Sequence, residues 1–126
     1  MAGSFFTALW RPRVGRTSRR VVVRHRGQTV ADSARCWRVT QILHAPVHYV
    51  PRAEVAGALA PSARRTYCPY KGVASYWDLH VGDAVVRDAA WSYGDPKPGY
   101  VELRGAVAFD RSKVDEYAVG PARAGG

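Results

Sequence analysis

The sequence predicts a mainly β protein that folds as one domain and contains one short helix. Runs rich in β-branched and aromatic residues recur along the chain, and turn-forming residues separate them about every eight to twelve residues. A chain of 126 residues is long enough for one domain with its own hydrophobic core. We expect a flexible basic leader over residues 1–20, a single β domain over residues 21–119 and a flexible tail over residues 120–126.

The leader region carries most of the positive charge. The formal net charge is +9, yet seven arginines and no acidic residue fall within residues 1–26, which leaves twelve basic against ten acidic side chains elsewhere. Because the excess is local, we do not expect a nucleic-acid partner. We expect an unstructured extension here, with a targeting peptide or a segment docked through Phe5, Phe6 and Trp10 as alternatives.

The first strands follow the leader. Residues 21–25 form a β-branched run and residues 29–31 a second strand, so a hairpin with its turn around Gly27 is predicted. Trp, Val, Thr and Ile favour another strand within residues 36–43. A short strand follows over residues 47–50.

Residues 52–60 are the best candidate for the helix. A proline just before the first turn is tolerated, and Pro61 ends the segment. Val55 and Leu59 lie one turn apart and give it a narrow apolar stripe.

A second hairpin is predicted further along the chain. Residues 73–79 alternate, which places the rings of Tyr76 and Trp77 on opposite faces of a strand. A turn at Gly82 returns the chain into a strand over residues 84–91.

The last part of the domain begins with a loop over residues 91–99. Residues 100–103 alternate as a strand, Gly105 is expected to form a bulge, and residues 106–109 continue the strand. A final strand or coil covers residues 114–119.

Residues 64–77 hold the densest group of functional side chains. The stretch contains a thiol, an amine, two guanidinium groups and four aromatic rings. Pro69 and Gly72 bend the backbone at two points. We interpret the stretch as the wall of a binding pocket.

Cys68 and Lys71 are the candidates for catalysis. Neighbouring cations favour a thiolate, and an aromatic surround favours loss of the lysine proton. Alternatively, Cys68 is a packed apolar residue and Lys71 pairs with Asp88. No complete catalytic set or nucleotide-binding motif is present.

No metal site or cofactor is predicted. A structural zinc site needs four ligands, usually in paired spacing, and Cys36 and Cys68 form no CxxC pair. Pro46 lies between His44 and His48, which makes a shared helical face for these histidines unfavourable.

Several motifs, in fixed order within residues 21–115, resemble the domain of unknown function 427 family. They are Thr29-Val30-Ala31-Asp32-Ser33, Tyr49-Val50-Pro51-Arg52, Cys68-Pro69-Tyr70-Lys71-Gly72 with Ala74, Tyr76 and Trp77, Asp88-Ala89-Ala90-Trp91-Ser92-Tyr93, and Gly105-Ala106-Val107-Ala108-Phe109. The chain departs from the family pattern at Gln41, usually Glu, and at Gly94, often an acidic residue.

The resemblance implies two antiparallel sheets that meet at an angle, as in tent-shaped Mss-four-like folds, and no established reaction. Some members carry a nucleotidyltransferase-like label, and that activity requires closely spaced carboxylates for magnesium. Asp78, Asp83 and Asp88 form no such motif, so we do not adopt the label.

We therefore predict a small cytoplasmic protein without a membrane segment, whose pocket binds a small polar or aromatic ligand. Arg52, Arg65 and Lys71 would contact an anionic group. The expected ligand-binding residues are Arg52, Arg65, Tyr67, Cys68, Tyr70, Lys71, Tyr76, Trp77, Asp88, Trp91 and Tyr93.

Two other functions remain open at this point. One is an enzyme that uses Cys68 or Lys71 in covalent or acid/base chemistry. The other is a nucleic-acid accessory protein that acts through the basic leader. Exposed edge strands in a small β domain also favour a homodimer.

Overall fold

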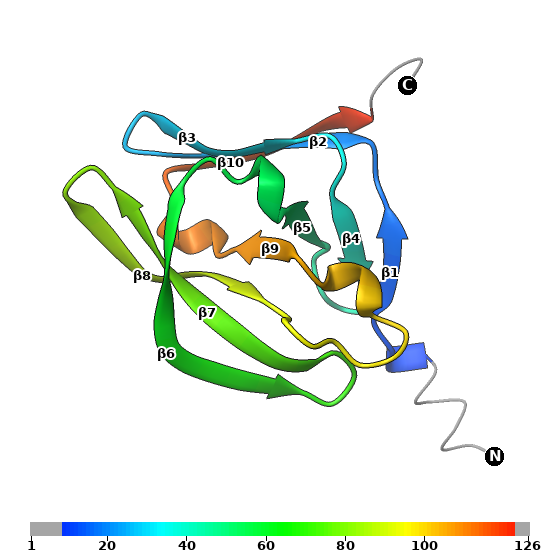
Figure 1. Cartoon of the computed structure of the whole chain (residues 1–126). Coiled ribbons are helices and arrows are strands. Elements are labelled where there is room, and N and C mark those ends of the chain that lie inside the picture. The colour runs from blue at the N-terminus through cyan, green and yellow to red at the C-terminus, as the bar shows by residue number, and fades with distance from the viewer. Residues whose placement is uncertain (1–8, 123–126) are drawn as a thin grey trace.

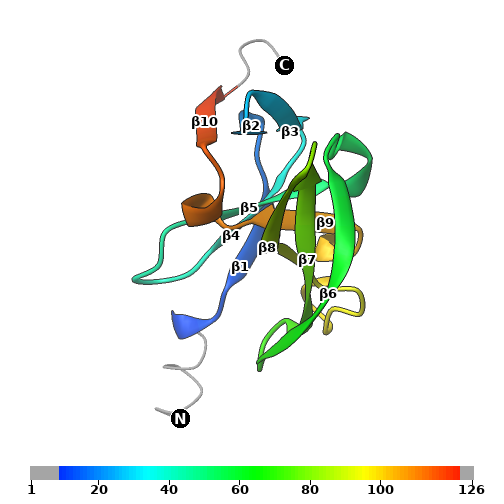
Figure 2. The same ribbon diagram turned by 90° about the vertical axis from the view of Figure 1, so that its left-hand side faces the viewer.

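The computed structural model describes residues 9–122 and contains two antiparallel sheets (Figure 1), as predicted. The larger sheet has seven strands in the order β1 (Arg13–Arg16), β4 (Trp37–Thr40), β5 (Val47–Pro51), β9 (Ala106–Phe109), β8 (Ala84–Ser92), β7 (Gly72–Val81) and β6 (Ala58–Cys68). The smaller sheet has the order β10 (Glu116–Ala122), β2 (Arg19–His25) and β3 (Gln28–Ser33). Figure 2 shows β6, β7 and β8 side by side, while the loop between β4 and β5 projects to the other side.

Both predicted hairpins are present. In the turn between β2 and β3, Arg26 and Gly27 have φ angles of 49° and 77°, the combination that suits the right-handed twist of a two-residue hairpin. Between β7 and β8, Gly82 has a φ of 57°. These turns formed as expected because their chemistry is local to the turn itself.

An aliphatic core forms around the smaller sheet. β2 alternates, so that Val21 and Val23 are fully buried. They pack with residues of both sheets, principally Val30, Val50, Leu79, Val107 and Phe109. This aliphatic core holds the smaller sheet to the larger one, because it is the apolar surface that the two have in common.

An aromatic cluster forms a second centre of packing. Its buried members are Val39, Tyr49, Ala74, Tyr93, Tyr100, Leu103, Ala106 and Ala108, with Trp37, Tyr76 and Trp91 partly buried against them. Adjacent residues of one strand divide between the two centres: Tyr49 belongs to the aromatic cluster and Val50 to the aliphatic core. Strand alternation therefore gives the larger sheet two chemically different faces.

The predicted helix over residues 52–60 is wrong. Only η1 (Arg52–Glu54) is helical, as a single 3₁₀ turn, and β6 begins at Ala58. The backbone N–H groups of Ala56 and Gly57 donate to the carbonyl of Val30, and a Cβ at Gly57 would come within 2.9 Å of the Val30 side chain. This close approach to β3 and the long pairing of β6 with β7 outweigh a weak helical pattern.

The predicted strand over residues 100–103 is also wrong. This segment forms η2 (Val101–Leu103), a 3₁₀ turn, after Gly99 with its φ of 93°. The Tyr100 hydroxyl is drawn inward, where it donates to the carbonyl of Pro12 at 2.7 Å. Gly105, with a φ of 74°, lies in the turn before β9 and not in a bulge. A third 3₁₀ turn, η3 (Arg111–Lys113), follows β9.

The proposed boundary of the flexible leader differs from the structure. Residues 13–16 form β1, which pairs with β4 at the edge of the larger sheet, and β2 begins at Arg19. The arginine-rich composition of this segment did not indicate a strand, because β1 forms by pairing with β4, which is distant in sequence. Phe5 and Phe6 lie outside the described residues, whereas the Trp10 carbonyl accepts a hydrogen bond from the Gln41 side chain at 3.0 Å. At the other end, β10 extends to Ala122.

Candidate functional site

The Cys68-Pro69-Tyr70-Lys71-Gly72 stretch is the turn of the hairpin between β6 and β7. Cys68 and Gly72 face each other as the last paired residues, and Gly72 has a φ of 110°. The Lys71 backbone N–H donates to the Cys68 sulfur at 3.4 Å, and the Lys71 carbonyl accepts from the Lys97 N–H at 3.0 Å. These two hydrogen bonds hold the backbone of the turn, and they therefore fix the position of the Lys71 Cα atom.

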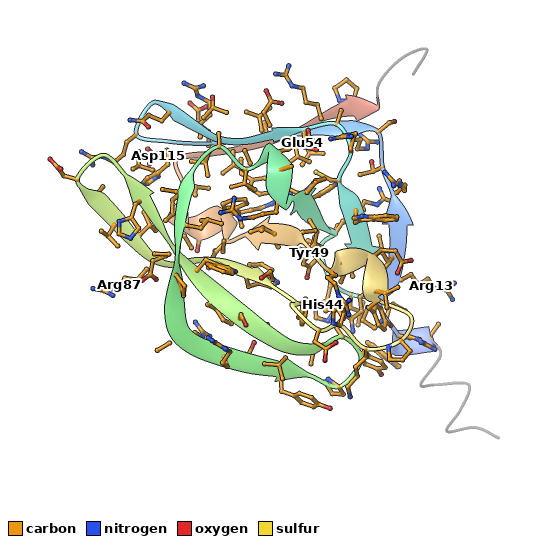
Figure 3. The ribbon with its side chains drawn as sticks, viewed as in Figure 1. Arg13, His44, Tyr49, Glu54, Arg87 and Asp115 are labelled. Atoms are coloured by element: carbon orange, nitrogen blue, oxygen red, sulfur yellow. The ribbon has the colours of Figure 1, made fainter. Side chains whose placement is uncertain are left out.

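Beside this turn lies a concavity of about 330 Å³, which we call the aromatic pocket. Strands β4, β5, β7 and β8, the β4–β5 loop and the β6–β7 turn contribute its walls. Its lining residues are Val39, Gln41, His44, Ala45, Val47, Tyr49, Lys71, Tyr76, Trp91 and Tyr93. Figure 3 shows Tyr49 in the interior of the molecule.

The rings of the aromatic pocket pack against one another at oblique angles. Tyr49 and Trp91 meet edge to face with centroids 6.5 Å apart, and Tyr76 and Trp91 are tilted at 6.4 Å. Tyr93 packs on Tyr49 at 6.3 Å. The Trp91 indole N–H donates to the Tyr49 hydroxyl at 3.2 Å. These contacts hold the rings in favourable geometry.

The buried phenols of this pocket stay protonated at neutral pH. Burial raises the pKa of Tyr49 to about 12, although the hydrogen bond from Trp91 acts in the opposite direction. Burial, followed by the proximity of Tyr49 and Cys68, raises the pKa of Tyr93 strongly. Both hydroxyls are therefore available as neutral hydrogen-bonding groups.

Two cations contact the aromatic rings. The Lys71 ammonium lies 5.6 Å from the centroid of the Tyr93 ring, and the Arg64 guanidinium lies 4.6 Å from that of Tyr76. Lys71 is half-buried. Within residues 9–122 it forms no ion pair.

The predicted pair between Lys71 and Asp88 is not formed. β8 bulges where three of its residues lie opposite Asp78 of β7, and Asp88 has a φ of 52°. Its carboxylate accepts from the Ser62 hydroxyl of β6, and its N–H donates to Asp78 at 2.8 Å. The bulge therefore commits Asp88 to a structural role away from Lys71.

Other predicted site residues are also separated from the pocket. Tyr67 is 63 % exposed and accepts a hydrogen bond from the Lys97 ammonium. Arg65 is exposed and donates to backbone carbonyls of its own strand. Cys68 and Tyr70 pack against the aromatic cluster without lining the pocket. Trp77 faces the aliphatic core, on the side of β7 opposite Tyr76, as the alternation predicted.

Arg52 lies in a different concavity, also of about 330 Å³, which we call the arginine pocket. It is lined by Arg52, Trp77, Ser92, Tyr93, Gly94, Arg104, Gly105, Ala106 and Val107. Tyr93 borders both pockets. Arg52 and Lys71, which were expected to contact one anionic group, therefore line different concavities.

Three polar residues line the pocket but are not among the predicted ligand-binding residues: Tyr49, Gln41 and His44. Alternation within β5 places Tyr49 on the same face as Val47. Tyr49 meets Trp91 of β8 only because β9 pairs with β5 on one side and with β8 on the other. Gln41 and His44 lie in the β4–β5 loop, where no local sequence pattern predicts which way a side chain points. Gln41 lines the aromatic pocket and Gly94 the arginine pocket.

No group of three or more His, Cys, Asp or Glu side chains is placed to hold a metal ion in the described part of the chain. Cys36 is buried, Cys68 is half-buried, and neither forms a disulfide. Across residues 9–122 there is no helix with the length and apolarity needed to cross a membrane.

Comparison with known proteins adds one relationship. A family model described as "Domain of unknown function (DUF427)" matches residues 13–120. The match begins at β1 and ends within β10, so it covers β1 to β9 in full and most of β10. No curated protein matches the chain.

Proposed function

The chain belongs to the DUF427 family, and we propose that its aromatic pocket binds a small molecule that carries a flat ring and an anionic group. The family description assigns no reaction, so the proposal rests on the side chains of the pocket. Its volume of about 330 Å³ is at the lower end of the range for small-molecule sites.

The observation that carries the proposal is the position of Lys71. Lys71 is half-buried and its ammonium lies over the Tyr93 ring, yet no carboxylate pairs with it in residues 9–122. A partly desolvated cation without a counter-charge is unfavourable. A ligand anion would supply the missing partner by a charge-assisted hydrogen bond.

The rings supply the second half of the specificity. Tyr76 and Trp91 are partly exposed and line the same pocket as Lys71. A flat ligand ring would bury apolar surface against them, in the offset or edge-on contacts that aromatic groups favour. Gln41 and His44 at the β4–β5 loop add polar atoms that can fix its orientation.

Cys68 does not support a thiol enzyme. Its sulfur accepts the Lys71 N–H beneath the turn, and Cys68 is absent from the residues that line the aromatic pocket. Since a nucleophile must reach the reacting atom, we assign Cys68 to the packing of the hairpin.

Native mass spectrometry of the protein purified from its source tests the proposal by identifying a retained ligand. Lys71→Met should then weaken binding of that ligand by about 1.5–3 kcal/mol, the range for hydrogen bonds to charged groups. Lys97→Met is the matched control, because Lys97 also lies over a tyrosine ring but outside this pocket. Equal affinities for both variants and the parent protein would contradict the proposal.

A further inference from the structure

Two arginines whose backbones are adjacent, Arg52 and Arg104, line the arginine pocket. The Arg52 N–H donates to the carbonyl of Gly105 at 2.8 Å, directly after the last pair between β5 and β9, Pro51 with Ala106. Arg104 precedes Gly105 in the chain. The pairing of two strands distant in sequence therefore brings both arginines to one concavity.

The positive charge of this pocket is poorly balanced. Arg104 lies 3.4 Å from Asp95, whose carboxylate is 98 % exposed, so this pair is a weak surface interaction. The structure shows no ion pair for Arg52 among residues 9–122. Two cations that line one pocket repel each other, and an anion bound in that pocket would relieve the repulsion.

The remaining walls favour a flat apolar group. The Trp77 indole N–H is already used by the Ser92 hydroxyl at 2.9 Å, so Trp77 offers this pocket mainly its apolar ring. Ala106 and Val107 complete the apolar wall. A Cβ at Gly94 would meet no atom within 4 Å, which leaves that side of the pocket open.

We propose that the arginine pocket is a second binding site, for a small planar organic anion. Arg52 and Arg104 hold the carboxylate or phosphate oxygens, for which the guanidinium fork is well matched. Trp77 contacts the flat group that carries the anion. This site goes beyond the function proposed above, because it uses neither Lys71 nor the rings of Tyr76 and Trp91.

Titration with benzoate and phenyl phosphate tests the proposal, with benzamide as the neutral counterpart and inorganic phosphate as the anion without a ring. The readout is the NMR signal of the Trp77 indole N–H, assigned with Trp77→Phe. We expect a saturable shift with benzoate or phenyl phosphate and a much weaker one with benzamide. Arg52→Gln and Arg104→Gln should each weaken binding about tenfold or more.

Two controls identify the site. Arg87→Gln removes the same charge from a side chain that is 83 % exposed and points away from the body of the protein (Figure 3), so binding should not change. Lys71→Met should also leave it unchanged, which separates this proposal from the aromatic pocket. If an arginine variant fails to fold, Gly94→Leu provides the alternative test, because it should fill the open side and abolish binding.

Three results would overturn the proposal. The first is the absence of a Trp77 shift with either planar anion at millimolar concentration. The second is a loss of binding in Lys71→Met with none in the arginine variants, which would place the anion in the aromatic pocket. The third is equal affinity for inorganic phosphate and phenyl phosphate, which would show that the planar group contributes nothing.

Discussion

The aliphatic core and the aromatic cluster share strands β5, β7, β8 and β9 but differ in the chemistry of their side chains. Val21, Val50 and Leu79 are fully buried aliphatic side chains without polar atoms. The aromatic cluster instead contains phenols, an indole N–H and nearby cations. Branched aliphatic groups fill space closely, whereas rings with polar edges leave concavities in which a ligand can contact both ring and charge.

The first prediction concerns the aliphatic core. Leu79→Ala should lower the free energy of unfolding by about 3–5 kcal/mol, because Leu79 is fully buried and its removal leaves a cavity. Val73→Ala on the same strand, where Val73 is 50 % exposed, should cost no more than about 0.5 kcal/mol. Urea unfolding measures both values. Similar costs for the two variants would mean that the core does not dominate stability.

The second prediction concerns the aromatic cluster at high pH. The folded-state pKa of Tyr49 is about 12, above the value near 10 for an unfolded chain. Its stabilising contribution is therefore complete below about pH 10 and lost as pH rises towards 12, by up to about 3 kcal/mol. Tyr93 acts in the same direction.

Unfolding of the parent protein and of Tyr49→Phe from pH 9 to 12 measures this contribution. The variant should show a shallower alkaline decline, although it is less stable at neutral pH because the Trp91 N–H loses its acceptor. Tyr67→Phe, at an exposed position, is the control for removal of a phenol hydroxyl outside the cluster. Identical slopes for all three proteins would contradict the assignment.

The third prediction concerns His48, the exception on the aliphatic face of β5. His48 is 4 % exposed, and neither ring nitrogen has a hydrogen-bond partner in the described structure. Burial lowers its pKa, and the charges of Arg111, Arg38 and Arg19 lower it further. The unfolded chain therefore binds the proton more tightly, so stability is complete above about pH 6.5 and falls at lower pH, by at most about 1.4 kcal/mol per pH unit.

Replacing His48 should remove that dependence. In His48→Gln, the free energy of unfolding should change less between pH 7 and pH 5 than in the parent protein, as measured by urea unfolding. His80→Gln is the control, because His80 is exposed. A steeper slope in His48→Gln than in the parent would mean that His48 is not held neutral.

The elements that the sequence predicted correctly depend on local chemistry. Both hairpins follow from turn residues with positive φ, and the opposite orientations of Tyr76 and Trp77 follow from strand alternation. The helix over residues 52–60 failed because a non-local contact of Gly57 with β3 decides that segment. Tertiary packing commonly overrides a short helical pattern in this way.

The candidate site was predicted in part for the same reason. Lys71, Tyr76, Trp91 and Tyr93 were identified from their residue types and do line one pocket. Arg52 lines another pocket than Lys71, because its position depends on the pairing of β5 with β9. Sequence motifs identified the side chains, but the order of strands in the sheet determined which of them meet.

The last and smallest expected effect is on the stability of Lys71→Met, which tells whether Lys71 is a ligand-binding residue or a structural one. In Lys71→Met the free energy of unfolding should change by no more than about 1 kcal/mol, because the variant loses one cation–π contact and keeps most of the stem. A buried pair would behave differently, since removing one partner strands the other charge at a cost of about 3–5 kcal/mol. The Asp88 carboxylate already accepts a hydrogen bond from the Ser62 hydroxyl, so no stranded carboxylate is expected. Thermal and urea unfolding distinguish the two outcomes, and a loss of several kcal/mol would show that the chain uses Lys71 for stability and leaves no cation free for a ligand.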